Sequence, residues 1–143
     1  RVVVDSRLEM PHDAKVLEGG GTLIFTALDA DRPLNAETHR LPNPHGKVEL
    51  PEMLNELARR GINELHVEAG FRLNGSLVRE GCVDELLVYL APSFVGDTGL
   101  GMFSLPELTD LAQRVQLSVR DLTRVGEDIR VVARLQRQAS APR

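Results

Sequence analysis

The stretch that decides the fold runs from residue 65 to residue 92 and reads LHVEAGFRLNGSLVREGCVDELLVYLAP. Apolar and polar residues alternate over Leu65–Glu68, which is typical of an extended strand. Leu73 and Leu77 are four residues apart and would share one face of a helix, and Gly81 suits the residue that ends it. Residues 86–91 form an unbroken apolar run, as in a strand covered on both faces. The pattern predicts strand, tight turn, short helix and strand, a right-handed βαβ unit.

The junction between the first strand and the helix is the candidate binding site. Free backbone N–H groups and the helix dipole converge at a helix N-terminus and favour an anion there. Gly70 would let a phosphate approach the backbone closely. Gly75 adds a second position without a side chain, and Ser76 adds a hydroxyl donor. Glu68 lies two residues before the turn, so its carboxylate would face the same crevice. On spacing alone, the alternative is a structural turn with a solvated carboxylate.

The rest of the chain also indicates an α/β domain. Parallel strands are expected at Val2–Asp5, Thr22–Ala27, Leu65–Glu68 and Glu85–Ala91. One apolar stripe predicts a helix over Leu50–Arg60, and the polar stretch 29–46 predicts an irregular excursion with room for a short strand. Alternating apolar and polar residues over Val115–Leu135 predict an antiparallel hairpin with one solvent-exposed face. The expected fold is a three-layer α/β domain, with a mainly parallel sheet flanked by helices and a C-terminal antiparallel hairpin.

Composition narrows the function classes. The chain has 143 residues, the length of one domain. Its net charge of −4 argues against a general nucleic-acid-binding protein, which would normally be basic. No run reaches the ~18 apolar residues of a membrane helix, so we expect no membrane partner. The single cysteine excludes an internal disulfide and a cysteine-rich zinc site, and no metal site is expected. A reducing cytoplasm is the simplest compartment.

Several short motifs resemble one known domain and occur in its order. They are Val67-Glu68-Ala69-Gly70, Leu73-Asn74-Gly75-Ser76-Leu77, Gly81, Val83-Asp84-Glu85-Leu86 and Tyr89-Leu90-Ala91-Pro92, with Arg1 to Arg7, Leu105-Pro106-Glu107-Leu108 and Val125-Gly126-Glu127-Asp128 on either side. Together they resemble the reductase domain of the bifunctional riboflavin-biosynthesis deaminase/reductase. The resemblance covers nearly the whole chain, and its order and spacing make it specific.

The resemblance implies the dihydrofolate-reductase-like fold and an NADPH-dependent reductase of riboflavin biosynthesis. Hydride would pass from the nicotinamide to the ribose C1′ of an aminouracil phosphoribosylamine and give the ribityl chain. Glu68 would touch this phosphorylated pyrimidine substrate. The cofactor phosphates would be lined by Gly70, Phe71, Arg72, Leu73, Asn74, Gly75 and Ser76. Ser6 would contact the cofactor, with an ordinary turn serine as the alternative. No catalytic residue is assigned, because the cofactor carries the hard chemistry.

The chain also departs from the family pattern. Arginine is common in the family where this chain has Leu100. We expect residues 1–136 to be a reductase domain without its N-terminal part and residues 137–143 to be a flexible tail. The Cys-x-x-Cys signature of the zinc deaminase half is not in the chain. From this we expect a homo-oligomer that is a poor enzyme by itself. Two alternatives stay open: a related reductase acting on a pterin-like substrate, and a non-catalytic assembly module.

Overall fold

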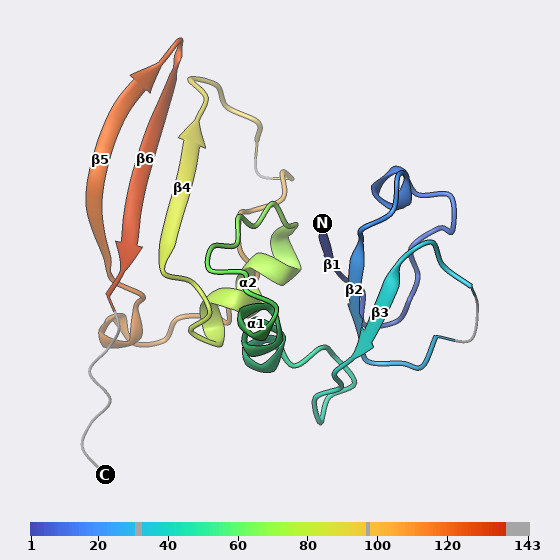
Figure 1. Ribbon diagram of the computed structural model, residues 1–143. Helices are drawn as coiled ribbons and strands as arrows, with labels where there is room; N and C mark the ends of the chain where they lie inside the picture. The colour runs from blue at the N-terminus through green and yellow to red at the C-terminus, as the bar shows by residue number, and fades with distance from the viewer. Residues whose placement is uncertain (31–32, 97, 137–143) are drawn as a thin grey trace. The chain divides into compact units, whose positions relative to one another are not determined.

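The computed structural model describes residues 1–30, 33–96 and 98–136 (Figure 1). The chain forms two compact units, Arg1–His66 and Val67–Arg143. Together they contain a parallel sheet, two α-helices and an antiparallel sheet, which confirms the predicted α/β class. The tail predicted at 137–143 lies outside the described residues.

The first unit is built on a three-stranded parallel sheet. Its strands are β1 (Val2–Val4), β2 (Leu23–Thr26) and β3 (Glu37–Arg40), with β2 in the middle. The connection from β1 to β2 contains a short 3-10 helix, η1 (Lys15–Leu17). The first two strands are confirmed, and β3 is the short strand for which the polar stretch left room.

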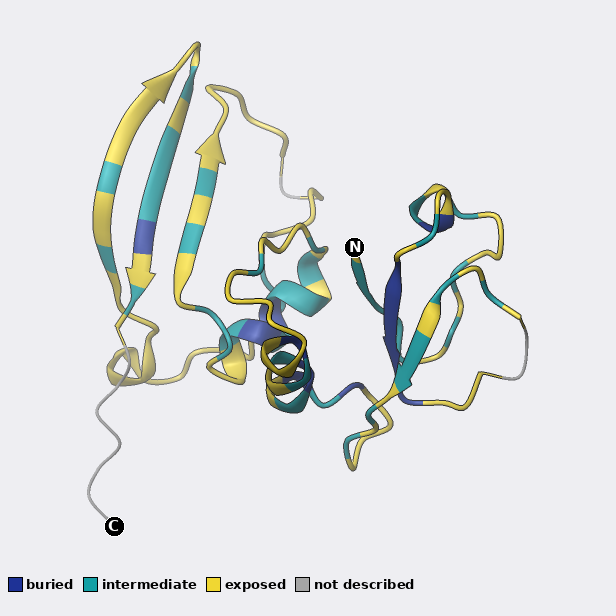
Figure 2. Ribbon diagram, in the orientation of Figure 1, coloured by how far each residue is buried: buried dark blue, intermediate teal, exposed yellow. Residues whose placement is uncertain are grey.

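The central strand β2 supplies the core of this unit. All four of its residues are buried, and Ile24 and Phe25 are 0% exposed (Figure 2). Burying such a side chain contributes about 1.5–3 kcal/mol. The ring of His39, on β3, lies 5.6 Å from that of Phe25 at a tilted angle. The buried hydroxyl of Thr22, just before β2, is satisfied because it donates to the Val16 carbonyl at 2.7 Å.

Helix α1 (Leu50–Arg59) follows the sequence pattern closely. Of the predicted apolar stripe, Leu50, Met53 and Leu57 are buried and Leu54 is partly exposed. Gly61 follows the helix with φ +82°, and the Ile62 N–H donates to the Leu57 carbonyl at 3.0 Å. This is a Schellman motif, whose left-handed position glycine occupies without strain.

Glu56 lies at the centre of a charge network on α1. Its carboxylate accepts from Arg60 at 2.7 Å and from Arg59 at 3.0 Å. Arg59 also binds Glu52, and Arg60 binds Glu37, each at 2.7 Å. Hydrogen bonds from Arg60 and then Arg59 hold the pKa of Glu56 below its usual value. The pKa values of Glu37 and Glu52 are lowered for the same reason.

The second unit contains helix α2 (Phe71–Arg79) and an antiparallel sheet. The sheet has the order β4 (Glu85–Leu90), β6 (Asp128–Leu135) and β5 (Leu117–Val125). A 3-10 helix, η2 (Leu111–Gln113), precedes β5. Gly126, with φ +63°, opens the two-residue turn between β5 and β6, so the predicted hairpin is confirmed.

The register gives this sheet two different faces. Leu86, Ala133 and Val119 lie across from one another, as do Val88, Val131 and Leu122. These rows form an apolar face. The opposite face carries ion pairs, one between Arg134 and Glu85 at 3.3 Å and one between Arg130 and Asp121 at 2.8 Å. A bulge between Val119 and Asp121 preserves this division along β5.

Two details of the predicted topology are wrong. Residues 63–70 lie outside any helix or strand, so Leu65–Glu68 is not a strand, and Val67 there is 44% exposed. β4 pairs antiparallel with β6, not parallel with an earlier strand. The βαβ unit expected over 65–92 is therefore absent from this described stretch. An apolar run indicates burial but not strand direction, and alternation over four residues forms a strand only where a backbone partner exists.

The charge network predicts a specific loss of stability in acid. Carboxylates with lowered pKa values stabilise the fold above their unfolded pKa, about 4.3, and this stability is lost as pH falls through the folded pKa. Glu56→Gln should therefore flatten the fall of Tm between about pH 5 and pH 3. Thermal unfolding across pH measures this. The exposed Glu64, changed to Gln, is the control and should keep the wild-type slope; an equal slope in Glu56→Gln would contradict the network.

Candidate functional site

The first backbone N–H groups of α2 have no hydrogen-bond partner within the helix. Gly70 is the N-cap, with φ −81° and ψ 170°, and its carbonyl accepts the first helical bond from Asn74 N–H at 3.1 Å. The N–H groups of Phe71, Arg72 and Leu73 precede that bond and have no carbonyl one turn earlier in the helix. Because Gly70 has no side chain, it provides no cap for them. These three amides can bind an external acceptor.

Gly70 is not needed for the protein's own packing. Its φ is negative, so the backbone does not require glycine there. A Cβ atom built at Gly70 would meet nothing within 4 Å. The missing side chain therefore leaves open surface at the helix N-terminus, where a ligand can approach the backbone.

The charges at this helix end favour an anion. The first turn of α2 contains no acidic side chain, and it places the exposed Arg72 at the positive end of the helix dipole. A cation at this end is unfavourable by itself, because the dipole favours negative charge there. An anion bound to the first-turn amides would neutralise both, which suits a phosphate.

Gly75 has a different role from Gly70. It is buried in the middle of α2, against the backbone of Ser104. A Cβ atom there would overlap the Ser104 carbonyl oxygen and would lie 2.7 Å from the Ser104 nitrogen. The bare position predicted at Gly75 is therefore filled by another segment of the same unit.

The side chains of Asn74 and Ser76 are also engaged within the unit. The Asn74 amide donates to the Ala69 carbonyl at 3.0 Å and to the Met102 carbonyl at 3.3 Å. The Ser76 hydroxyl accepts from Arg79 at 2.9 Å. Of the seven residues expected at the phosphates, Gly70 to Leu73 thus form the open N-terminus, while Asn74 to Ser76 lie further along the helix.

Glu68 is exposed in the extended segment two residues before Gly70. It belongs to the same compact unit as α2. Glu68 therefore still lies close in sequence to the N-terminus of α2, although its segment is not a strand.

Ser6 lies in the first unit, at the carboxyl end of the parallel sheet. Its carbonyl accepts from the N–H of Ala27, directly after β2, at 3.1 Å. Its hydroxyl accepts from the Val48 N–H at 3.1 Å. A hydroxyl can donate as well as accept, so this structural bond does not prevent Ser6 from contacting a ligand. Ligands of open α/β sheets bind beyond this edge.

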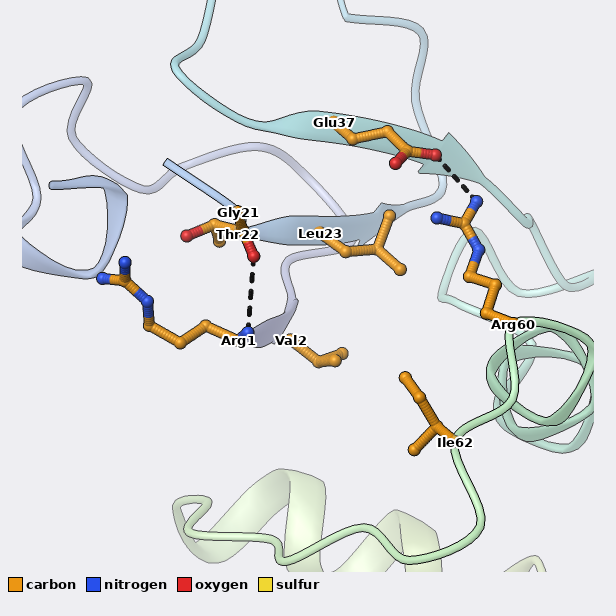
Figure 3. A pocket seen from close by; sticks show the side chains of 8 residues that line it. All are labelled: Arg1, Val2, Gly21, Thr22, Leu23, Glu37, Arg60 and Ile62. Carbon is orange, nitrogen blue, oxygen red and sulfur yellow. Dashed lines mark hydrogen bonds and ion pairs between the residues drawn. The ribbon is translucent and has the colours of Figure 1, made fainter. Parts of the chain in front are cut away.

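A hollow of about 330 Å³ lies at the opposite end of the same sheet. Figure 3 shows its lining, which includes Arg1, Glu37 and Arg60. These charges are already paired within the protein. Arg60 binds Glu37 at 2.7 Å, and the Arg1 guanidinium donates to three backbone carbonyls. The hollow therefore offers little to a charged ligand.

Two kinds of site find no support in the described part of the chain. Residues 1–30, 33–96 and 98–136 contain no group of three or more His, Cys, Asp or Glu side chains placed to hold a metal ion. Within the same ranges, no helix has the length and apolar character needed to cross a membrane.

Comparison with known proteins decides the family. Residues 1–131 match the model described as the RibD C-terminal domain. The chain belongs to this family. Riboflavin biosynthesis protein RibD of Escherichia coli is 32% identical over 132 residues, which cover 90% of this chain and 36% of the relative. The resemblance expected from the motifs is therefore confirmed.

Solved RibD structures support the same fold. Acinetobacter baumannii RibD aligns with a TM-score of 0.81 at 26% identity, over 95% of this chain and 37% of that one. RibD reductase domains have the dihydrofolate-reductase-like fold, so that expectation is confirmed. The chain spans a little over a third of these two RibD proteins.

Sequence reasoning missed Arg79 and Ser104. Arg79 donates to the Ser104 carbonyl at 2.6 Å, and the Ser104 N–H donates to the Phe71 carbonyl at 2.9 Å. The spacing of Ser76 and Arg79, three residues apart on a helix, could have suggested their contact. No sequence signal could have found Ser104, because it acts through its backbone.

The two glycines predict responses of different size to alanine. Gly→Ala inside a helix normally stabilises by about 0.5–1 kcal/mol, but Gly75→Ala overlaps backbone and should destabilise by about 1–3 kcal/mol. Gly70→Ala is the matched control and should cost less, about 0.5–1 kcal/mol, because open space surrounds the new Cβ atom and alanine is only a poorer N-cap than glycine. Denaturant unfolding measures both. A Gly75→Ala protein as stable as wild type would contradict the packing of Ser104 on α2.

Proposed function

We propose that this RibD-family chain reduces the ribosyl group of an aminouracil phosphoribosylamine to the ribityl form with NADPH. The proposal depends on one observation: a relative named as a reductase aligns with nearly the whole of this chain. A protein of Archaeoglobus fulgidus, named 2,5-diamino-6-ribosylamino-4(3H)-pyrimidinone 5′-phosphate reductase, is 31% identical over 96% of this chain. The chain covers 63% of that relative. Nearly all of this chain thus aligns with a protein named for reduction alone.

The residues at the α2 N-terminus fit the cofactor phosphates. Gly70 leaves the backbone accessible, the amides of Phe71 to Leu73 donate, and Arg72 adds positive charge. When bound, NADPH supplies the hydride for the ribose C1′. The protein's part is to bind, orient and neutralise charge. Asn74, Gly75 and Ser76 lie further along the same helix and would support the cofactor-binding turn, because Gly75 is packed against Ser104 and the side chains of Asn74 and Ser76 are already hydrogen-bonded.

Glu68, in the second unit, and Ser6, in the first, are the other two proposed ligand contacts. Glu68 would bind the pyrimidine substrate, since a carboxylate accepts hydrogen bonds from ring and amino N–H groups. Ser6 would bind the cofactor through its hydroxyl proton, while its oxygen keeps the bond from Val48. Both assignments come from the family resemblance, and the exposure of Glu68 and the sheet-edge position of Ser6 support them.

The proposal includes a homo-oligomer in the cytoplasm. The apolar face of the antiparallel sheet supports association, because Val119 and Leu122 on β5 are 59% and 66% exposed. Such surfaces often mark protein interfaces.

Gly70→Val tests the cofactor site. The branched side chain would occupy the space through which a phosphate reaches the first-turn amides, so NADPH affinity should fall at least tenfold, about 1.4 kcal/mol. The fold should be retained, because residues with φ −81° and ψ 170° accept valine. Fluorescence titration with NADPH and thermal unfolding measure the two effects. Unchanged NADPH affinity in Gly70→Val would contradict a cofactor site at this turn. A wild-type chain that binds no NADPH would favour the assembly-module alternative.

Glu68→Gln tests the substrate site. Loss of the carboxylate should raise the KM for the pyrimidine about tenfold or more, since hydrogen bonds to charged groups are worth ~1.5–3 kcal/mol. NADPH affinity should barely change. Glu64→Gln, four residues earlier and also exposed, is the control and should behave as wild type. A lower Tm with normal kinetics in Glu68→Gln would make Glu68 a structural residue.

A further inference from the structure

The segment Gly101–Ser104 is held against the first turns of α2 by several contacts. The Ser104 N–H donates to the Phe71 carbonyl at 2.9 Å, and Arg79 donates to the Ser104 carbonyl at 2.6 Å. Asn74 donates to the Met102 carbonyl at 3.3 Å. A Cβ atom at Gly101 would lie 3.6 Å from the Phe71 ring. We call these contacts the α2 clamp.

Gly75 makes the clamp possible. The Phe71 carbonyl points along the helix toward residue 75, its partner one turn later. The Ser104 backbone can reach the same carbonyl only because residue 75 has no side chain. One helical carbonyl therefore meets both its own helix and a second segment, which fixes the first turn of α2 from the side.

Asn74 joins the clamp to the proposed phosphate-binding turn. Its side-chain amide has two N–H donors. Both are directed at carbonyls, one of Met102 in the clamp and one of Ala69 just before Gly70. A phosphate bound at the turn would need hydrogen-bond donors. The Asn74 amide already donates to two carbonyls, so it is poorly suited to bind a phosphate as well. Its geometry suits positioning.

We infer that Asn74 and Arg79 are positioning residues that hold the Ala69–Gly70 turn and the first amides of α2 in place for the cofactor phosphates. This inference rests on the proposed function of that turn. Arg79 lies at the other end of α2 from the open amides and acts through Ser104 and Ser76. Its guanidinium donates to both, a fork that a single ammonium cannot reproduce.

The test compares Arg79→Ala with Arg72→Ala in NADPH titrations over a range of salt concentrations. Loss of Arg79 should weaken NADPH binding about tenfold, because small misplacement of binding groups is costly. The salt dependence should stay as in wild type, since Arg79 contributes geometry. Arg72→Ala should weaken binding and also reduce the salt dependence, because a charge facing the phosphate is lost. Arg79→Lys should recover part of the affinity.

Two controls separate positioning from general stability. Thr109→Ala shortens an exposed, uncharged side chain in the segment after the clamp and should bind NADPH as wild type does. Arg120→Ala removes an exposed arginine on β5 of the same unit and should also be neutral. Titrations are made at a temperature where each variant is folded by circular dichroism. Hydrogen exchange adds a direct readout, since the Ser104 amide should exchange faster in Arg79→Ala.

The outcomes are distinct. Weaker binding, unchanged salt dependence and faster exchange at Ser104 support the clamp. Wild-type NADPH affinity in folded Arg79→Ala overturns it, with the proposed function intact. A salt dependence reduced as in Arg72→Ala also overturns it, because Arg79 would then face the phosphate directly. If the wild-type protein binds no NADPH, the proposed function itself fails.

Discussion

The close approach of the Ser104 backbone to Gly75 is the contact on which the second unit's candidate site depends. It brings a distant segment within hydrogen-bond reach of the Phe71 carbonyl and of Arg79. A helix N-terminus is a useful anion site only if its amides keep their direction when charge arrives. A nine-residue helix is marginal by itself, so contacts from outside the helix must supply that rigidity.

In the first unit, the buried central strand β2 is the main source of stability. Its sheet has three short strands, and its stability depends on the complete burial of β2. With Ile24 and Phe25 inside, the polar groups nearby must find partners, and the Thr22 hydroxyl does so by donating to the Val16 carbonyl. The carboxyl edge of this sheet is where Ser6 lies, fixed by Val48 and Ala27. Rigid burial in the middle of the sheet thus supports a polar residue at its edge.

The sequence predicted best the features that depend on neighbours along the chain. Both helices end in Schellman motifs at Gly61 and Gly81, and the hairpin turns at Gly126, each with positive φ. These follow from single residues with a strict backbone requirement. The direction of β4 and the absence of a strand at Leu65–Glu68 depend on which distant strand offers hydrogen bonds, and apolar patterning does not contain that information. The role of Ser104 was hidden for the same reason, because a backbone contact leaves no mark on residue type.

The two glycines of α2 show why a motif must be separated into its physical parts. Gly70 and Gly75 belong to one recognisable run, but only Gly75 has a close neighbour within the protein. At Gly75 that neighbour is the protein's own backbone, so the residue is explained by packing. At Gly70 neither φ nor packing requires glycine, and the open space adjoins three amides and Arg72. Packing therefore accounts for Gly75, whereas Gly70 is an N-cap that leaves open space beside the first amides of α2, so the proposed phosphate contact concerns the first four residues of the run.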